Sequence, residues 1–109
     1  PSAVIITLGE SGALVLPAAG ATPTHVPSPP VQAVDTVGAG DAFCGALAVR
    51  IAAGDTLLAA VAFACRAAAL ACTRPGAAAA LPSLAEIEQF TRTLPSGTEP
   101  SFPPQRFTL

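Results

Sequence analysis

The sequence predicts a small α/β domain, and three observations along the chain carry this prediction. A β-branched run at 3–8 is followed by a glycine-containing turn and a second apolar run, the pattern of a strand hairpin. Two long, alanine-rich apolar segments come later, at 42–53 and 56–72, and their length favours buried helices. Strands followed by apolar helices indicate helices layered on a sheet.

The composition indicates that other protein covers much of this domain's surface. Hydrophobic residues make up 51% of the 109 residues and charged residues only 11%. This balance excludes a disordered chain and leaves little charge to cover a small domain. Since the first residue is Pro1, we expect the chain to be the C-terminal part of a longer protein. Expressed alone, residues 1–109 should aggregate.

Charge and cysteine usage exclude several classes of protein. The net charge is −2 and lysine and tryptophan are absent, which argues against a nucleic-acid surface. No uninterrupted apolar run reaches membrane-span length, and no signal peptide is visible at this N-terminus. An odd set of cysteines without C-x-x-C spacing favours buried free thiols in a reducing cytosol over a disulfide or a metal site, so we expect a cytoplasmic protein; the cysteines are Cys44, Cys65 and Cys72.

The first third of the chain should form short strands. Residues 3–8 are continuously apolar, as expected of a strand buried on both faces. Residues 9–12 are the turn and 13–16 the returning strand. We expect an edge strand at 25–27, where a proline cannot donate to a ladder, and a further short strand at 31–34.

Two apolar helices should follow. The first is expected from Asp41 to Ala53, with Gly54 as its C-terminal cap. Asp55 is the expected N-cap of the second, which runs to about Cys72. Because this helix carries one charge beyond its cap, it should be buried nearly all round.

The last helix is predicted by a capping box. Ser83 and Glu86 have the required spacing, directly before an amphipathic segment that runs to about Thr93. Its apolar face should carry Leu84, Ile87 and Phe90. Residues 95–109 are rich in Pro, Ser and Thr without periodicity, so we expect a poorly ordered tail.

The chain is organised around residues 34–43, Val-Asp-Thr-Val-Gly-Ala-Gly-Asp-Ala-Phe. The glycine-rich turn lies between an apolar run and a helix, so it sits at a helix N-terminus, where free N–H groups and the helix dipole favour an anion. Asp35 and Asp41 flank this anion site. Acid groups beside an anion site favour chemistry over simple binding.

Spacing excludes two common phosphate-binding patterns for this turn. The dinucleotide fingerprint G-x-G-x-x-G finds its first pair in Gly38 and Gly40, but Phe43 occupies the third place. A bulky ring there prevents close packing of helix on strand. A P-loop requires a lysine, and the chain contains none.

The pattern D-T-x-G-A-G-D-x-F matches completely at 35–43, and this stretch strongly resembles the second signature of the ribokinase-like (PfkB-type) carbohydrate kinases. Residues 7–12 (Thr-Leu-Gly-Glu-Ser-Gly) resemble the family's strand-turn beside the nucleotide, and 73–77 (Thr-Arg-Pro-Gly-Ala) its T-R-x-G-A helix end. Within the family the chain looks most like the ribokinases. The resemblance implies that residues 1–94 are the C-terminal portion of a three-layer α/β/α fold, followed by the tail.

The resemblance also implies an activity, transfer of the γ-phosphoryl group of ATP to a sugar hydroxyl, with D-ribose as the favoured acceptor. Fructokinases and nucleoside kinases of the same family are alternatives, and a non-catalytic sugar- or nucleotide-binding relative is a rival. The backbone N–H groups of Ala39, Gly40 and Asp41 are suited to the charge of the transferring group, and Gly38 and Gly40 allow close approach. Asp41 would accept the proton of the attacking hydroxyl; its alternative role is an ordinary N-cap.

A monovalent cation, K⁺, is a further implication of the resemblance. Asp35 would help to hold it, together with backbone carbonyls of Val37, Ala71, Arg74 and Gly76. The family often has a serine where this chain has Ala80, which leaves one ligand open. The alternative role of Asp35 is a turn-forming Asx residue.

The nucleotide would lie against both turns. By resemblance, Thr7, Gly9 and Gly12 join Gly40 and Asp41 as nucleotide-site candidates, and Cys65 falls where some ribokinases contact the adenine. A plain hairpin turn and core packing are the alternatives for these residues. His25 has no evident partner in the sequence.

The remaining parts of such a kinase are not in this sequence. The family positions Mg²⁺ through an N-x-x-E motif, and the chain contains no asparagine. We therefore expect the Mg²⁺ ligands, most of the sugar site and its lid in a missing N-terminal part, the whole protein forming a homodimer. Residues 1–109 alone should be inactive.

Overall fold

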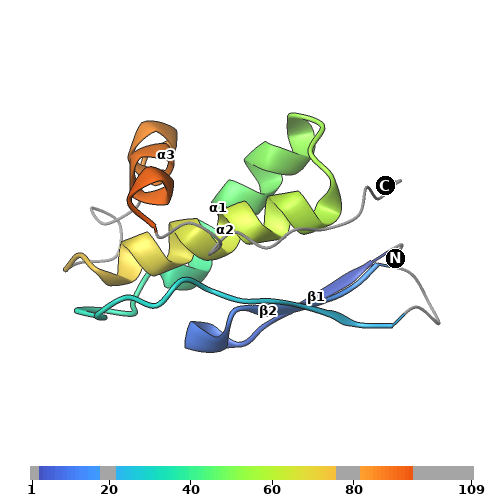
Figure 1. Cartoon of the computed structure of the whole chain (residues 1–109), viewed down its shortest axis with the longest axis horizontal. Coiled ribbons are helices and arrows are strands. Elements are labelled where there is room, and N and C mark those ends of the chain that lie inside the picture. Colours follow the sequence, from blue (N-terminus) through green and yellow to red (C-terminus); the bar gives the residue numbers. More distant parts are fainter. Residues whose placement is uncertain (1–2, 18–21, 76–81, 95–109) are drawn as a thin grey trace.

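The computed structural model describes residues 3–17, 22–75 and 82–94. A small sheet lies beneath the helices α1 and α2, and α3 lies on the opposite side of α2 from the sheet (Figure 1). The predicted α/β class is confirmed. In chain order the elements are β1 (Val4–Thr7), the 3-10 turn η1 (Gly9–Ser11), β2 (Ala13–Leu16), β3 (Thr24–Val26), α1 (Ala39–Ala52), α2 (Leu57–Cys72) and α3 (Leu84–Thr93).

The three strands form one antiparallel sheet in the order β1-β2-β3. Val4 pairs with Leu16 across the hairpin, and Leu14 pairs with His25 of β3. The predicted hairpin and edge strand are thus confirmed, with β3 one residue earlier than expected. The strand predicted at 31–34 is wrong. This segment instead runs beside the end of α2, where the Val34 N–H donates to the Cys72 carbonyl at 2.7 Å.

Burial of the sheet is confined to the face beneath the helices. Ala13 and Val15 of β2 and Val26 of β3 are fully buried in a core shared with α2. The prediction that 3–8 is buried on both faces is wrong, since Val4 and Ile6 are 45% and 53% exposed. The physical reason is that β1 is an edge strand and the described helices cover one face only.

The two long helices differ in burial. α2 is buried nearly all round, as predicted: 11 of its 16 residues are buried. α1 was expected to be buried as well, but it buries only Ala42 and Phe43, and Val49 is 57% exposed. α2 packs along one flank of α1, and nothing in the described chain covers the other.

Helix boundaries differ from the prediction by a few residues. α1 begins at Ala39 because Gly38, with φ of 89°, is its N-cap; Asp41 therefore lies in the first turn and not at the cap. Gly54 (φ 95°) follows the end of α1, as predicted. The N-cap assignment of Asp55 is wrong. The Thr56 hydroxyl caps α2, and the Asp55 carboxylate instead accepts two hydrogen bonds from Arg50, at 2.8 and 3.0 Å.

The capping box of α3 is confirmed. The Ser83 hydroxyl accepts from the Glu86 N–H and the Glu86 carboxylate accepts from the Ser83 N–H. Ile87 is buried, whereas Leu84 is 47% exposed. No helix in the described ranges is long and apolar enough to cross a membrane. The predicted tail at 95–109 lies outside the described residues.

Candidate functional site

A cavity of about 480 Å³ lies where the hairpin turn (residues 9–12), the connector at 28–36 and the start of α1 meet α2. Five of the six residues proposed for a nucleotide line it, the exception being Asp41. These five residues come from three separate segments of the sequence. They are Thr7, Gly9, Gly12, Gly40 and Cys65.

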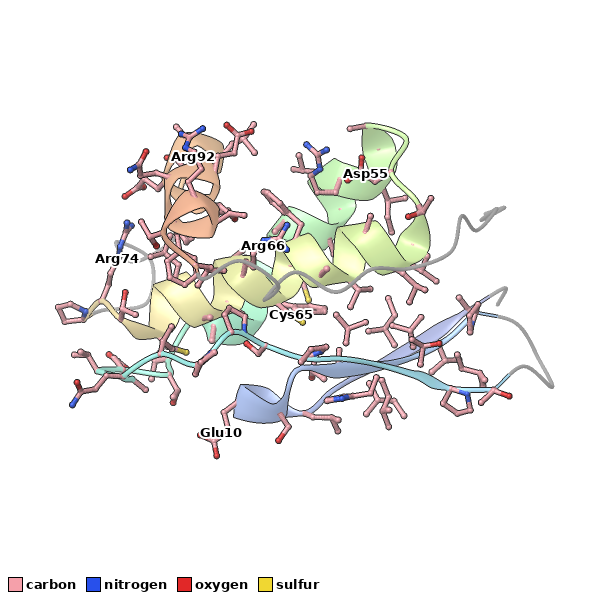
Figure 2. All side chains as sticks on the ribbon, viewed as in Figure 1. Glu10, Asp55, Cys65, Arg66, Arg74 and Arg92 are labelled. Atoms are coloured by element: carbon pink, nitrogen blue, oxygen red, sulfur yellow. The ribbon has the colours of Figure 1, made fainter. Side chains whose placement is uncertain are left out.

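The walls of this cavity come from α2, the hairpin turn and the start of α1. α2 contributes Cys65, Ala68 and Ala69, and Figure 2 shows Cys65 on the side of α2 that faces the strands. The start of α1 contributes Gly40 and Phe43. Among the described residues that line the cavity, Glu10 on η1 is the only charged one. An anion in this cavity would thus meet backbone dipoles and no basic side chain.

The hairpin turn is closed by its own backbone. The Gly12 N–H donates to the Gly9 carbonyl at 3.1 Å, and the Leu8 N–H donates to the Gly12 carbonyl at 2.8 Å. Gly9 (φ 60°) and Gly12 (φ 96°) both have positive φ, which side-chain-bearing residues rarely adopt. A Cβ on Gly12 would also lie 2.0 Å from the Val26 carbonyl oxygen. The turn is therefore pressed against β3.

The glycine loop (residues 36–41) opens α1. The Ala39 N–H donates to the Thr36 carbonyl at 3.2 Å, so this N–H is already bonded in the loop. The N–H groups of Gly40 and Asp41 belong to the first helical turn, which has no preceding carbonyl of its own helix to bond. Together with the helix dipole they make the end of α1 suited to an anion. Gly40 places this group at the cavity wall.

Asp41 is exposed and lies on a different side of the first turn of α1 from the cavity. It lines a smaller hollow of about 200 Å³ between α1 and α3, with Gly45, Leu84 and Ile87 among its neighbours there. Gly40 on one side and Asp41 on the other are adjacent in the chain. Two successive residues of the first turn of α1 therefore line two different hollows, Gly40 the cavity and Asp41 the smaller hollow.

Asp35 lies beside the C-terminal end of α2. Its N–H donates to the Cys72 carbonyl at 3.1 Å, and its carboxylate oxygen Oδ1 accepts from the Val37 N–H at 2.9 Å. Asp35 therefore forms the Asx turn that was its alternative role. The negative end of the α2 dipole and the Asp35 carboxylate together favour a cation.

Only some of the proposed cation ligands can be placed. Ala71 and Arg74 lie at the same end of α2, where the Arg74 N–H donates to the Ala71 carbonyl at 3.2 Å. Gly76 and Ala80 fall outside the described residues. Across the described ranges no group of three or more His, Cys, Asp and Glu could hold a metal ion. A cation here would depend chiefly on backbone carbonyls.

Arg74 also joins α2 to α3. Its guanidinium donates to the Glu86 carboxylate, and Figure 2 shows Arg74 at the end of α2, beside α3. This contact and the hydrogen bond from the Ser83 N–H lower the pKa of Glu86 from 4.5 to about 2. The ion pair thus connects Arg74, one of the proposed cation ligands, to α3.

The cysteines are free thiols, as predicted, in three environments. Burial raises the pKa of the Cys65 thiol to about 11, so it is neutral at pH 7. Burial and the Asp35 carboxylate raise the pKa of Cys72. Cys44 was expected to be buried but is exposed, because it lies on the uncovered flank of α1.

His25 is a site-related residue that sequence reasoning missed. Its Nε2 lies 2.5 Å from the Ser11 carbonyl oxygen of the hairpin turn. No local pattern could reveal this contact, because it joins residues 14 apart and depends on how β3 pairs with β2.

Comparison with known proteins shows the family to which this chain belongs. The family described as pfkB family carbohydrate kinase matches residues 1–84. The ribokinase of Bacillus subtilis is 43% identical over 89 residues, which cover 82% of this chain and 30% of that protein.

Solved structures of similar proteins share the fold. A ribokinase from Thermotoga maritima superposes with a TM-score of 0.79 at 39% identity, over 84% of this chain and 30% of that one. A double mutant of a Vibrio cholerae fructokinase, solved with fructose, ADP and a potassium ion, gives 0.73 at 37% identity, over 82% of this chain and 30% of that one.

The chain spans less than a third of the length of these relatives. The family match nevertheless covers most of the chain and includes both turns that line the cavity. The chain belongs to the pfkB family of carbohydrate kinases.

Proposed function

We propose that the complete protein containing this chain is an ATP-dependent sugar kinase that converts D-ribose to D-ribose 5-phosphate. One observation carries the proposal: a cavity lined by Gly40 at the N-terminus of α1, with the Asp41 carboxylate on the next residue. The similarity to ribokinases from several organisms favours ribose over other acceptors.

ATP would lie in the cavity with its base against the apolar wall. Cys65, Ala68 and Ala69 offer a surface of small side chains, and the neutral Cys65 thiol suits contact with a purine. The phosphates would then extend toward the N–H groups of Gly40 and Asp41. Because phosphoryl transfer depends on positioning and on stabilising negative charge, backbone donors and a helix dipole are suitable groups.

Asp41 would act as the general base. As the sugar oxygen forms a bond to the γ-phosphorus, the bond from that phosphorus to the ADP oxygen breaks, and the hydroxyl proton passes to the Asp41 carboxylate. The exposed position of Asp41, facing away from the cavity, leaves room for a sugar on the far side of the γ-phosphate. Donor and acceptor would approach the first turn of α1 from its two sides.

Mg²⁺ would shield the charge of the ATP phosphates, but this chain offers no ligand set for it. The described residues hold no suitable cluster, and the chain has no asparagine for the family's N-x-x-E motif. We propose that these ligands lie in an N-terminal part of the protein, together with most of the sugar site. That part would also cover the exposed apolar residues of β1 and α1, and the complete protein would be a cytoplasmic homodimer.

A potassium ion would fit at Asp35. The carboxylate and the carbonyl end of α2 attract a cation there, and the similar fructokinase contains a potassium ion. The ion would stabilise the glycine loop on the side of the C-terminal end of α2. Asp35→Asn keeps an oxygen to accept from the Val37 N–H but removes the charge, so it should abolish K⁺ activation without unfolding the loop. Turnover that is the same in K⁺ and Na⁺ would refute the site.

The proposed function is tested by assaying the complete protein with ATP and a panel of D-ribose, D-fructose and adenosine. ADP release gives kcat/KM and mass spectrometry identifies the product. We expect ribose 5-phosphate from the best substrate. A preference for fructose or adenosine would show that the acceptor is another substrate of the family and not ribose. ATP binding without phosphorylation of any acceptor would favour the non-catalytic alternative.

A further inference from the structure

One side chain of β3 forms a hydrogen bond with the hairpin turn that lines the cavity. His25 Nε2 lies 2.5 Å from the Ser11 carbonyl oxygen. A carbonyl can only accept, so Nε2 carries the proton and His25 donates. His25 itself does not line the cavity.

This bond adds to the backbone hydrogen bonds of the turn. The Leu8, Gly9 and Gly12 carbonyls accept from the N–H groups of Ser11, Gly12 and Leu8 respectively. The Ser11 carbonyl instead accepts from the imidazole. His25 therefore supplies a bond that the turn cannot make with its own backbone.

A second contact ties the turn to β3 at the same place. Gly12 lies so close to β3 that a Cβ would meet the Val26 carbonyl oxygen at 2.0 Å and the Ser28 nitrogen at 2.8 Å. η1 lies at the end of the hairpin formed by β1 and β2 (Figure 1). Beside these two contacts, the turn is held by its own backbone bonds and by the adjoining ladder, in which Ala13 of β2 pairs with Val26 of β3.

We propose that His25 is a positioning residue for the nucleotide: it holds the hairpin turn at the spacing from α2 that ATP requires. This inference rests on the proposed function, because it takes the cavity to be the ATP site. His25 contacts no reacting group and acts through the turn. Its loss should weaken nucleotide binding and leave sugar binding and the chemical step unchanged.

The test compares two substitutions that differ in the donor. His25→Phe keeps a planar ring on β3 and removes the N–H, whereas His25→Gln retains a side-chain N–H at similar reach. In the complete protein, His25→Phe should raise KM for ATP roughly two- to tenfold, the range expected for one hydrogen bond. His25→Gln should restore most of the affinity. KM for the sugar and kcat should remain at wild-type values in both variants.

Thr22→Ala is the control, because Thr22 is exposed and precedes β3. Hydrogen–deuterium exchange at residues 9–12 gives a readout independent of turnover: the Gly12 amide should exchange faster in His25→Phe than in His25→Gln. Unchanged KM for ATP in His25→Phe would overturn the inference. An equal rise of KM for ATP and for the sugar in both variants would also overturn it, since that indicates a general structural defect.

Direct binding of ATP, measured by calorimetry, separates this inference from the proposed function. If wild type binds ATP but phosphorylates no sugar, the proposed function fails, and weaker binding by His25→Phe still supports the positioning role. If wild type phosphorylates ribose and His25→Phe binds ATP normally, the function stands and the inference falls.

Discussion

The hairpin turn and the glycine loop line one cavity, yet their glycines meet different constraints. Gly12 has a positive φ and lies against the backbone of β3, with no space for a Cβ. Gly40 has helical geometry, and a Cβ there would meet nothing within 4 Å. The chain's own packing requires glycine at 12, whereas at 40 it leaves open space. If function requires glycine at 40, a ligand and not the packing of the chain would impose that requirement.

Gly12→Ala should have the largest effect on stability. The new methyl group must displace the backbone of β3 and adopt an unfavourable φ, which should cost roughly 2–4 kcal/mol. Urea denaturation of the complete protein measures this loss. An unfolding free energy within about 0.5 kcal/mol of wild type would show that the turn is not pressed against β3.

Gly40→Ala should separate function from stability. Alanine is the better helix former by about 0.5–1 kcal/mol, so unfolding should be unchanged or slightly harder. A methyl group at the cavity wall should nonetheless misplace the phosphates and lower kcat/KM for ATP by about 10²-fold. If Gly40→Ala lowered stability without lowering activity, Gly40 would have a structural role like that of Gly12, and the contrast between the two glycines would be contradicted.

Two exposed glutamates on α3 allow a related comparison, Glu86 and Glu88. Glu86 is bonded to Arg74 and Ser83, and these bonds lower its pKa from 4.5 to about 2. A depressed folded-state pKa contributes stability above pH ~4.5 that is lost as the pH falls toward ~2. Urea midpoints should show Glu86→Gln less stable than wild type at pH 6, with the gap closing by pH 2. The exposed pair makes this effect modest. A gap independent of pH would contradict it, and Glu88→Gln is the matched control.

The smallest predicted difference is chemical and concerns the cysteines. Cys44 is exposed, while burial raises the pKa of Cys65 to about 11 and leaves little thiolate at neutral pH. Iodoacetamide at pH 7.5 should therefore spare Cys65 in the native complete protein and label it once the protein is unfolded in urea, as measured by mass spectrometry. Equal labelling of Cys65 in native and unfolded protein would show that the cavity wall on α2 opens readily.

The parts of this structure that the sequence predicts are those with local causes. The hairpin, the buried α2 and the capping box at Ser83 each depend on residues near one another in the chain, and all three are confirmed. The strand expected at 31–34 is wrong, because its Val34 N–H bonds to the end of α2 and not to a neighbouring strand. Asp55 was misassigned because its ion pair with Arg50 competes with capping.

For the candidate site, the family resemblance proposed residues but not their arrangement. Five of the six nucleotide candidates line one cavity, which required only that the two turns face each other. The sequence could not show that Asp41 lies on another side of the helix turn, since this depends on α1 beginning at Ala39. Nor could it reveal His25, whose role follows from strand pairing.

The central claim, that Asp41 is the catalytic base beside an ATP cavity it does not line, is tested most directly by Asp41→Asn in the complete protein. The variant removes the proton acceptor and keeps the shape of the first helical turn. Glu88→Gln is again the control, as an equivalent change of an exposed carboxylate on α3. We expect kcat to fall by about 10²–10⁴-fold while the Kd for ATP stays within about threefold of wild type. Undiminished turnover in Asp41→Asn would contradict the account.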